Sequence, residues 1–248
     1  MTTIELPTED GTVDAYLARP DDGGPHPAVL LYMDAFGLRP HLRSMADRLA
    51  AAGHTVLVPN VFYRFGRAPV VELPEFINPA ERPEIIQAIG PAARTLTPEG
   101  AMRDAAVYLA WLEDSPLTTG GPVGVTGYCM GAGLALRTAG TYPERVAAAA
   151  GFHGAHLATD APDSPHLLAG RITAELYLGH ADQDSTNPAD QIARLEKALT
   201  EAGVEHRSEV YEGAHHGFTQ ADTAMYGAAA TERHWAALLD LFARRLTG

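Results

Sequence analysis

The sequence predicts an α/β protein with a mostly parallel central sheet, helices on both faces and an N-terminal β-hairpin. Two observations lead to this fold class. From residue 28 onward, short apolar segments of strand length alternate with segments of helical spacing. Before them, two short strand-like segments flank a Thr-Glu-Asp-Gly turn. A length of 248 residues suits one α/β domain, and since no repeat or linker divides the chain, we expect residues 1–248 to form a single domain.

The hairpin and the first βαβ unit come first along the chain. Residues 4–6 and 13–17 are the hairpin strands, and 28–33 is a continuous apolar strand. Leu42, Met45 and Leu49 give 41–52 helical spacing, and 55–58 is the next strand. The later elements are expected as a helix at 100–112, a strand at 122–126, a helix at 132–139, strands at 146–150 and 174–178, a helix at 188–202, a strand at 207–211 and a helix from about 223 to 246.

One segment departs from this rhythm. Pro59 to Pro98 holds seven of the 18 prolines and shows no long periodic run. We expect a loop-rich excursion over the carboxyl edge of the sheet. Its aromatic residues, such as Phe62, Phe65 and Phe76, suit either a lid over a binding site or ordinary packing of an irregular connection.

Composition narrows the partners. The formal net charge is −13, and no Lys/Arg cluster appears, which disfavours nucleic acids and anionic membranes. The first residues lack a basic and an apolar signal region, and no run approaches the roughly 18 apolar residues of a membrane helix. We therefore expect a cytoplasmic protein that acts on a small molecule. The sequence leaves its oligomeric state open, with a monomer plausible.

Cys129 is the only cysteine, and it lies in the G-x-C-x-G run 127–131 between a strand-like and a helix-like segment. Glycines two residues either side of a nucleophile allow a sharp strand-to-helix turn without Cβ clashes, so the side chain projects above the sheet. The alternative is a buried, inert cysteine, which is common in proteins. A single cysteine has no partner for an intramolecular disulfide. The turn therefore favours a nucleophile.

A catalytic thiol needs a base and a third group that orients the base. His216 begins a His-Gly-Phe run after the strand at 207–211 and is the predicted base, with His215 as its rival. The acid is expected after the strand at 174–178. Asp184, four residues before Pro188, is preferred, and Asp182 is the alternative acid.

An oxyanion hole needs two backbone N–H groups, one from the residue after the nucleophile and one from the loop after an early strand. Met130 and Ala35 occupy these positions. Asp34, beside Ala35, is either a regulator of the thiol or a solvated loop carboxylate. Phe36 and Tyr128 are expected to line the pocket.

Four motifs together resemble the dienelactone hydrolase (carboxymethylenebutenolidase) family. They are Gly-Tyr-Cys-Met-Gly, the His-Gly-Phe run after Tyr-x-Gly-Ala, the Asp-x-x-x-Pro loop and Asp-Ala-Phe-Gly-Leu near residue 34, and the resemblance covers about 4–246. It implies an α/β-hydrolase that hydrolyses enol-lactones without metal or organic cofactor. It implies a triad of Cys129, Asp184 and His216, with Asp34 at the acidic position that holds the resting thiol.

The chain departs from the family pattern at two positions. The early acid is usually Glu, so Asp34 has a shorter reach. The family's substrate-binding arginine, four residues after the catalytic histidine, is here Gln220. Arginines of the excursion are candidate replacements, namely Arg64, Arg67, Arg82 and Arg94. His153 follows a strand and is either a pocket residue or a hydrogen-bonded structural histidine.

The sequence thus predicts a lactone or carboxylic ester hydrolase that works through an acyl-cysteine. A non-catalytic small-molecule binding protein, or a catalyst of another reaction, on the same scaffold is the alternative. A zinc site built from His215, His216 and Asp184 lacks the usual ligand spacing. Redox sensing is weakened because the chain has no second cysteine.

Overall fold

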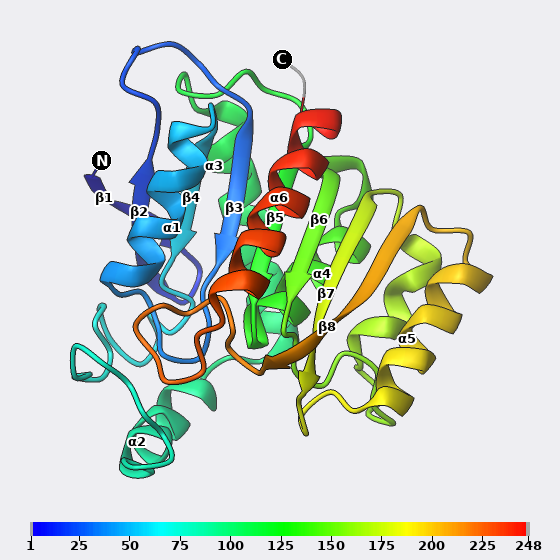
Figure 1. Ribbon diagram of the computed structural model, residues 1–248. Helices are drawn as coiled ribbons and strands as arrows, with labels where there is room; N and C mark the ends of the chain where they lie inside the picture. Colours follow the sequence, from blue (N-terminus) through cyan, green and yellow to red (C-terminus); the bar gives the residue numbers. More distant parts are fainter. Residues whose placement is uncertain (1, 247–248) are drawn as a thin grey trace.

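The fold is an eight-stranded sheet with helices on both faces, and the computed structural model describes residues 2–246 (Figure 1). The strands are β1 Thr2–Thr8, β2 Gly11–Ala18, β3 Ala28–Tyr32, β4 Thr55–Pro59, β5 Val123–Tyr128, β6 Val146–Phe152, β7 Glu175–Gln183 and β8 His206–His215. The helices are α1 Pro40–Ala51, α2 Glu84–Ala93, α3 Pro98–Asp114, α4 Met130–Thr141, α5 Ala189–Glu201 and α6 Ala228–Arg245, with short 3₁₀ helices at Pro143–Arg145 and Pro165–Arg171.

The strand order is β1-β2-β4-β3-β5-β6-β7-β8. The pairs β1–β2 and β2–β4 are antiparallel, and every later pair is parallel. Strands β3 to β8 therefore end at one common edge, the lower edge in Figure 1. Loops that follow these strands meet there, which is where a parallel α/β sheet forms its binding sites.

The helices bury the sheet from both sides. Helices α1 and α6 lie on the face toward the viewer in Figure 1, whereas α3 and α4 lie behind it. The central strands β3, β4 and β5 are buried along their whole length, as expected for parallel strands covered on both faces. The predicted α/β class with a mostly parallel sheet and an opening hairpin is confirmed.

The excursion between β4 and α3 contains a helix that the sequence analysis did not predict. Helix α2 includes Pro91, which hid its periodicity, but it buries Ile85, Ile89 and Ala92 on one side. Ile85 and Ile89 form a separate small core with Ile77, and the partly buried residues packed against it are Ala35, Phe36, Val71 and Leu73. The excursion therefore packs directly on the loop that follows β3.

Several element boundaries differ from the predicted ones. Strands β7 and β8 continue to Gln183 and His215, so residues expected in loops belong to the strand ends. Helix α6 begins at Ala228 rather than near residue 223, because 216–227 forms turns around the site. Pro188 precedes α5 instead of opening it, while Gly203 follows α5 with a φ of 70° as expected.

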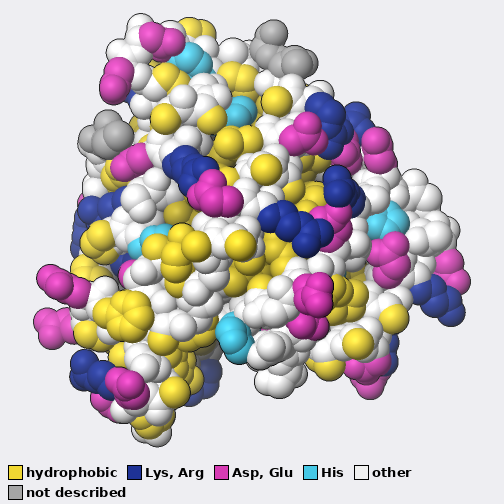
Figure 2. Space-filling view, viewed as in Figure 1, with side chains coloured by type: hydrophobic (Ala, Val, Ile, Leu, Met, Phe, Trp, Pro, Cys, Tyr) yellow, Lys and Arg dark blue, Asp and Glu magenta, His cyan; other side chains and the backbone are white. Residues whose placement is uncertain are grey.

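The surface carries dispersed charge. On the face shown in Figure 2, acidic and basic side chains are interspersed rather than gathered into a basic patch. The exposed apolar side chains Phe76 and Ile86 belong to the excursion. Within residues 2–246, no helix combines the length and the hydropathy needed to cross a bilayer.

Candidate active site

Cys129 lies at the tip of the turn between β5 and α4 with a φ of 55° and a ψ of −117°. A positive φ is strained for a residue with a Cβ and is uncommon outside functional turns. Cys129 is half-buried, and its amide donates to the Phe152 carbonyl at 3.1 Å, which ties the turn to the neighbouring strand β6. The strained backbone therefore holds the thiol at the carboxyl edge of the sheet.

The two flanking glycines are required by close contacts. A Cβ on Gly127 would lie 2.0 Å from the Gly131 carbonyl oxygen, and a Cβ on Gly131 would lie 2.6 Å from the Met33 carbonyl oxygen. Both distances are far below van der Waals contact, so neither position accepts a side chain. The contact at Gly131 also brings the strand-to-helix turn at 127–131 against the end of β3, where the loop with Ala35 begins.

His216 and Asp184 come together in the loops after β8 and β7. The Nδ1 of His216 lies 2.6 Å from Oδ2 of Asp184, and the Asp184 carboxylate is buried. Thr186 supports the other oxygen, since its amide and its hydroxyl donate to Asp184 Oδ1 at 2.8 and 2.6 Å. The sequence analysis did not single out Thr186, although a Thr two residues after an Asp suits such a turn.

Electrostatics couples His216 to both neighbours. Burial by itself lowers the pKa of His216, but hydrogen bonds to Asp184 and Cys129, and their negative charge, outweigh it and raise the pKa to about 10. Burial also disfavours the charged form of Asp184, yet hydrogen bonds from His216 and Thr186 hold its pKa below the usual value. The arrangement favours the imidazolium form of His216.

The two alternative residues make other contacts. Asp182 lies at the exposed end of β7, where its Oδ2 accepts a hydrogen bond from the Gly213 amide at 3.0 Å. His215 is the last residue of β8 and is exposed. The structure therefore joins Asp184, rather than Asp182, to His216.

The loop after β3 begins beside the strand-to-helix turn that carries Cys129. The register of β3 against β5 pairs Tyr32 with Gly127, so Ala35 and Cys129 follow their strands at similar heights. The Phe36 amide donates to Asp34 Oδ1 at 2.7 Å. Within residues 2–246, the Ala35 amide has no such protein acceptor, and Met130 is the first residue of α4, where N–H groups lack intrahelical acceptors.

Asp34 is not the solvated loop carboxylate that was one of the two alternatives, and a regulating role toward the thiol stays a prediction. It is 2% exposed, so it is not a solvated loop residue. Both of its oxygens accept hydrogen bonds from Nη1 of Arg39 at 2.8 Å, so its charge is directed at a guanidinium rather than at the thiol. Sequence reasoning missed Arg39, because it lies five residues after Asp34 in a loop and nothing local marks the two as a pair.

Gln220 takes part in the same cluster. It is buried, and its Oε1 accepts from Nη2 of Arg39 at 2.8 Å. Arg39 also binds Asp222. The position that carries an arginine in the family pattern is thus occupied by a glutamine, whose side chain accepts a hydrogen bond from an arginine of another loop.

Two other predicted pocket residues turn out to be buried. Tyr128 is fully buried and its hydroxyl lies 2.9 Å from Nε2 of His234 on α6, so the expectation that it lines the pocket is corrected. Strand alternation is the reason, because Tyr128 points to the α6 face of the sheet. His153 is also fully buried, bonded through Nε2 to Thr219 at 2.8 Å, with its ring against that of His216. Burial holds the pKa of His153 well below its usual value, which keeps it neutral.

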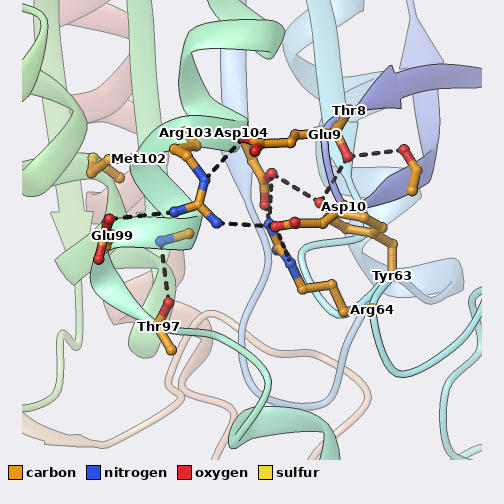
Figure 3. Close-up of polar contacts among 12 residues, drawn as sticks. Thr8, Glu9, Asp10, Tyr63, Arg64, Thr97, Glu99, Met102, Arg103 and Asp104 are labelled. Atoms are coloured by element: carbon orange, nitrogen blue, oxygen red, sulfur yellow. Dashed lines mark hydrogen bonds and ion pairs between the residues drawn. The ribbon is translucent and has the colours of Figure 1, made fainter.

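The arginines of the excursion have other partners. Arg64 binds Asp10 and Asp104 in a network at the opening hairpin, drawn in Figure 3. The other three lie at the surface, with Arg67 paired to Glu5, Arg82 paired to Glu84 and Arg94 exposed after α2. Arg64, Arg67 and Arg82 are therefore not free carboxylate clamps. Among the described residues, no group of three or more His, Cys, Asp or Glu side chains is arranged to hold a metal ion.

Comparison with known proteins places this geometry in a family. The model of the dienelactone hydrolase family matches residues 13–246. A carboxymethylenebutenolidase of Rhodococcus opacus is 29% identical, over 94% of this chain and 86% of its own length. A Synechocystis protein provisionally named carboxymethylenebutenolidase is 28% identical, over 99% of this chain and 97% of its own. A Klebsiella pneumoniae structure, provisionally named a dienelactone hydrolase, superposes with a TM-score of 0.84 at 22% identity and 98% coverage of both chains. The chain belongs to the dienelactone hydrolase family.

Proposed function

We propose that this hydrolase of lactones or carboxylic esters works through an acyl-cysteine intermediate, with Cys129 as nucleophile, His216 as base and Asp184 as the group that orients the base. The observation that carries the proposal is the 2.6 Å contact between His216 Nδ1 and Asp184 Oδ2, which leaves the other ring nitrogen available to the thiol. The strained backbone of Cys129 and the effect of its thiol on the pKa of His216 support the same pairing.

The steps follow from this pairing. His216 takes the proton of the Cys129 thiol, and Sγ attacks the carbonyl carbon to form a tetrahedral intermediate. As the C–O bond breaks, His216 returns the proton to the leaving oxygen. A water molecule, deprotonated by His216, then attacks the acyl-cysteine, and the carboxylic acid leaves as Sγ regains its proton. For a lactone, both halves leave as one hydroxy acid.

Backbone amides stabilise the charge that develops on the carbonyl oxygen. We assign this role to the N–H groups of Met130 and Ala35, and the close approach of Gly131 to the Met33 carbonyl at the end of β3 supports this assignment. Preorganised donors of this type contribute about 3–4 kcal/mol of transition-state stabilisation in related chemistry. No cofactor takes part in this scheme.

The excursion forms one wall of the proposed substrate pocket. Ile77, Ile85 and Ile89 pack against Ala35 and Phe36, which are themselves half-buried at the site. An apolar wall suits the hydrocarbon part of an ester or a lactone ring. Shape at this wall would then select among substrates of similar reactivity.

Trapping the intermediate tests the mechanism. Wild-type protein is quenched in acid during turnover of an activated ester and is then digested. The mass of the peptide that contains Cys129 is measured by mass spectrometry. The expected mass gain equals the acyl group, and Cys129→Ala shows neither the gain nor turnover. An unmodified Cys129 in a protein that hydrolyses the ester would contradict the mechanism. A chain that binds esters without turnover and whose Cys129 reacts with thiol reagents no faster than a free cysteine would instead favour a binding protein.

A further inference from the structure

Arg39, just before α1, is the most heavily bonded buried cation near the site. Its Nε donates to Asp222 at 2.6 Å, its Nη1 to Asp34 at 2.8 Å and its Nη2 to Gln220 at 2.8 Å. Nη1 also lies 3.3 Å from the Gly37 carbonyl, and Nη2 lies 3.1 Å from the second oxygen of Asp222. A guanidinium has five N–H groups, so all of them have protein acceptors. None remains to hold a substrate.

The first acceptor shapes the oxyanion loop. Asp34 accepts the Phe36 amide at 2.7 Å, and its carbonyl accepts the Gly37 amide at 3.1 Å, with Gly37 at a φ of 87°. These bonds form one tight turn with Ala35 at its tip. Because Arg39 holds both oxygens of Asp34, it sets the position of the turn and therefore of the Ala35 amide.

The other acceptors belong to the loop that follows the catalytic histidine. The backbone N–H of Gln220 donates to the carbonyl of Gly217, the residue after His216, at 2.9 Å. Asp222 also joins the excursion, because its carbonyl accepts the Ile77 amide at 2.8 Å. Arg39 thus joins the loop after β3 to the loop after His216, and Asp222 connects the excursion to the same cluster.

We propose that Arg39 is a positioning residue that acts through Asp34, holding the Ala35 amide where the carbonyl oxygen becomes negative. The inference rests on the proposed acyl-cysteine function. An oxyanion donor must lie about 2.7–3.1 Å from the developing charge, so a small displacement of the turn weakens it. The turn that carries the Met130 amide is held by the contact of Gly131 with the end of β3. Arg39 holds the loop that carries the Ala35 amide. Nη1 of Arg39 donates to both oxygens of Asp34, while Nε and Nη2 form a fork on Asp222 that fixes the direction of the guanidinium.

Two reactions of the same thiol separate positioning from general damage. Ester hydrolysis passes through an oxyanion. Alkylation by iodoacetamide does not, because Sγ forms a bond to the CH₂ carbon while the C–I bond breaks and iodide takes the electron pair. Arg39→Lys keeps the charge but loses the fork, and Asp34→Asn keeps one oxygen for the Phe36 amide. Arg48, an exposed ion-paired arginine in the helix α1 that follows Arg39, supplies the matched control Arg48→Lys.

The proposal predicts that Arg39→Lys and Asp34→Asn each lower kcat on a neutral p-nitrophenyl ester by about 10- to 100-fold, a part of the loss seen when an oxyanion donor is removed. Their KM and their rates of Cys129 alkylation stay within about twofold of wild type. Since the two residues act as a unit, the double variant should be no slower than the slower single variant. Arg48→Lys should match wild type in both reactions.

Other outcomes overturn the inference. If hydrolysis and alkylation fall together, Arg39 has only a structural role. If kcat is unchanged in Arg39→Lys, the cluster does not position the amide. Asp34→Asn decides the matter if Arg39→Lys fails to fold. A wild-type protein that alkylates readily but hydrolyses no ester would contradict the proposed function itself, and the inference would fall with it.

Discussion

Two arginines, Arg39 and Arg64, make networks of the same chemistry at the same edge of the sheet. Arg39 binds the carboxylates of Asp34 and Asp222, and Arg64 binds those of Asp10 and Asp104 (Figure 3). Each guanidinium bonds two carboxylates that are distant in sequence. The networks differ in the segments that their carboxylates belong to, namely scaffold elements for Arg64 and loops near Cys129 and His216 for Arg39.

The partners of Arg64 are scaffold elements. Asp10 lies in the turn of the opening hairpin, and Asp104 is a buried residue of α3 that also accepts the Tyr63 hydroxyl at 2.9 Å. This network fastens the hairpin to a helix. The partners of Arg39 lie instead in the loop with Ala35 and in the loop after His216. We therefore expect the Arg39 network, and not the Arg64 network, to influence the chemistry at Cys129.

The largest expected effect is on the rate at the site. Asp184→Asn should lower kcat by about 10³- to 10⁴-fold, because only the residue bonded to His216 selects its tautomer and stabilises the imidazolium. Asp182→Asn is the matched control and should change kcat less than about threefold, since Asp182 binds only the Gly213 amide. Steady-state kinetics of both variants measures this difference. The reverse ranking would give the orienting role to Asp182.

A smaller effect, on stability alone, is expected at the scaffold network. Asp104→Ala removes the buried carboxylate that Arg64 and the Tyr63 hydroxyl share, leaving the hydroxyl with Thr8 alone, and should lower the free energy of unfolding by about 3 kcal/mol. The low end of the usual range applies because Arg64 keeps Asp10. Urea unfolding measures the loss. The kcat of the folded variant should stay within about twofold of wild type, and a larger fall would erase the contrast with Arg39.

Substrate charge tests whether the Arg39 cluster is closed to ligands. The two carboxylates and one guanidinium leave one net negative charge. A neutral ester should therefore have a higher kcat/KM than its carboxylate-bearing analogue, by a factor that corresponds to about 1–3 kcal/mol of transition-state free energy. Gln220→Arg adds a positive charge and should improve the acid selectively. The ratio of kcat/KM for an acid and its methyl ester measures both. A wild-type preference for the acid would mean that a cation outside this cluster, such as Arg94, binds substrate.

The last prediction distinguishes the histidine pair from both arginine networks by its dependence on pH. The pKa of His216 is raised from 6.5 to about 10, so its pairing stabilises the fold fully below about pH 6.5, and this stabilisation is lost as pH rises toward 10. The pKa values of Arg39 and Arg64 are raised from an already high value, so these networks keep their cations over that range.

NMR titration of the His216 ring, with His216→Gln to assign the signal, checks this prediction. In Cys129→Ala the pKa of His216 should fall but remain above 6.5, because Asp184 still binds the ring. A His216 pKa that does not respond to Cys129→Ala would mean that the thiol and the ring are not paired.

Much of the site could be predicted because its signals are local. The G-x-C-x-G spacing around Cys129 lies within five residues, although the contact that excludes a side chain at Gly131 comes from the distant Met33 carbonyl. The loops with Asp184 and His216 follow recognisable strands. The order of strands and helices likewise follows from the period of apolar residues. Helix α2 escaped because Pro91 lies inside it, and its helicity is supported by the burial of Ile85 and Ile89 rather than by local propensity.

By itself, the sequence determined the α/β class, the turn that carries Cys129 and the residues able to serve as acid and base, since each depends on spacing along a short stretch of chain. The tertiary structure alone decided which carboxylate meets His216, that Tyr128 faces the core and that Asp34 binds Arg39 instead of the thiol. Arg39 also reaches acceptors 181 and 183 residues away. Such partners leave no periodicity in the sequence, because only the folding of distant loops onto one edge of the sheet brings their charges together.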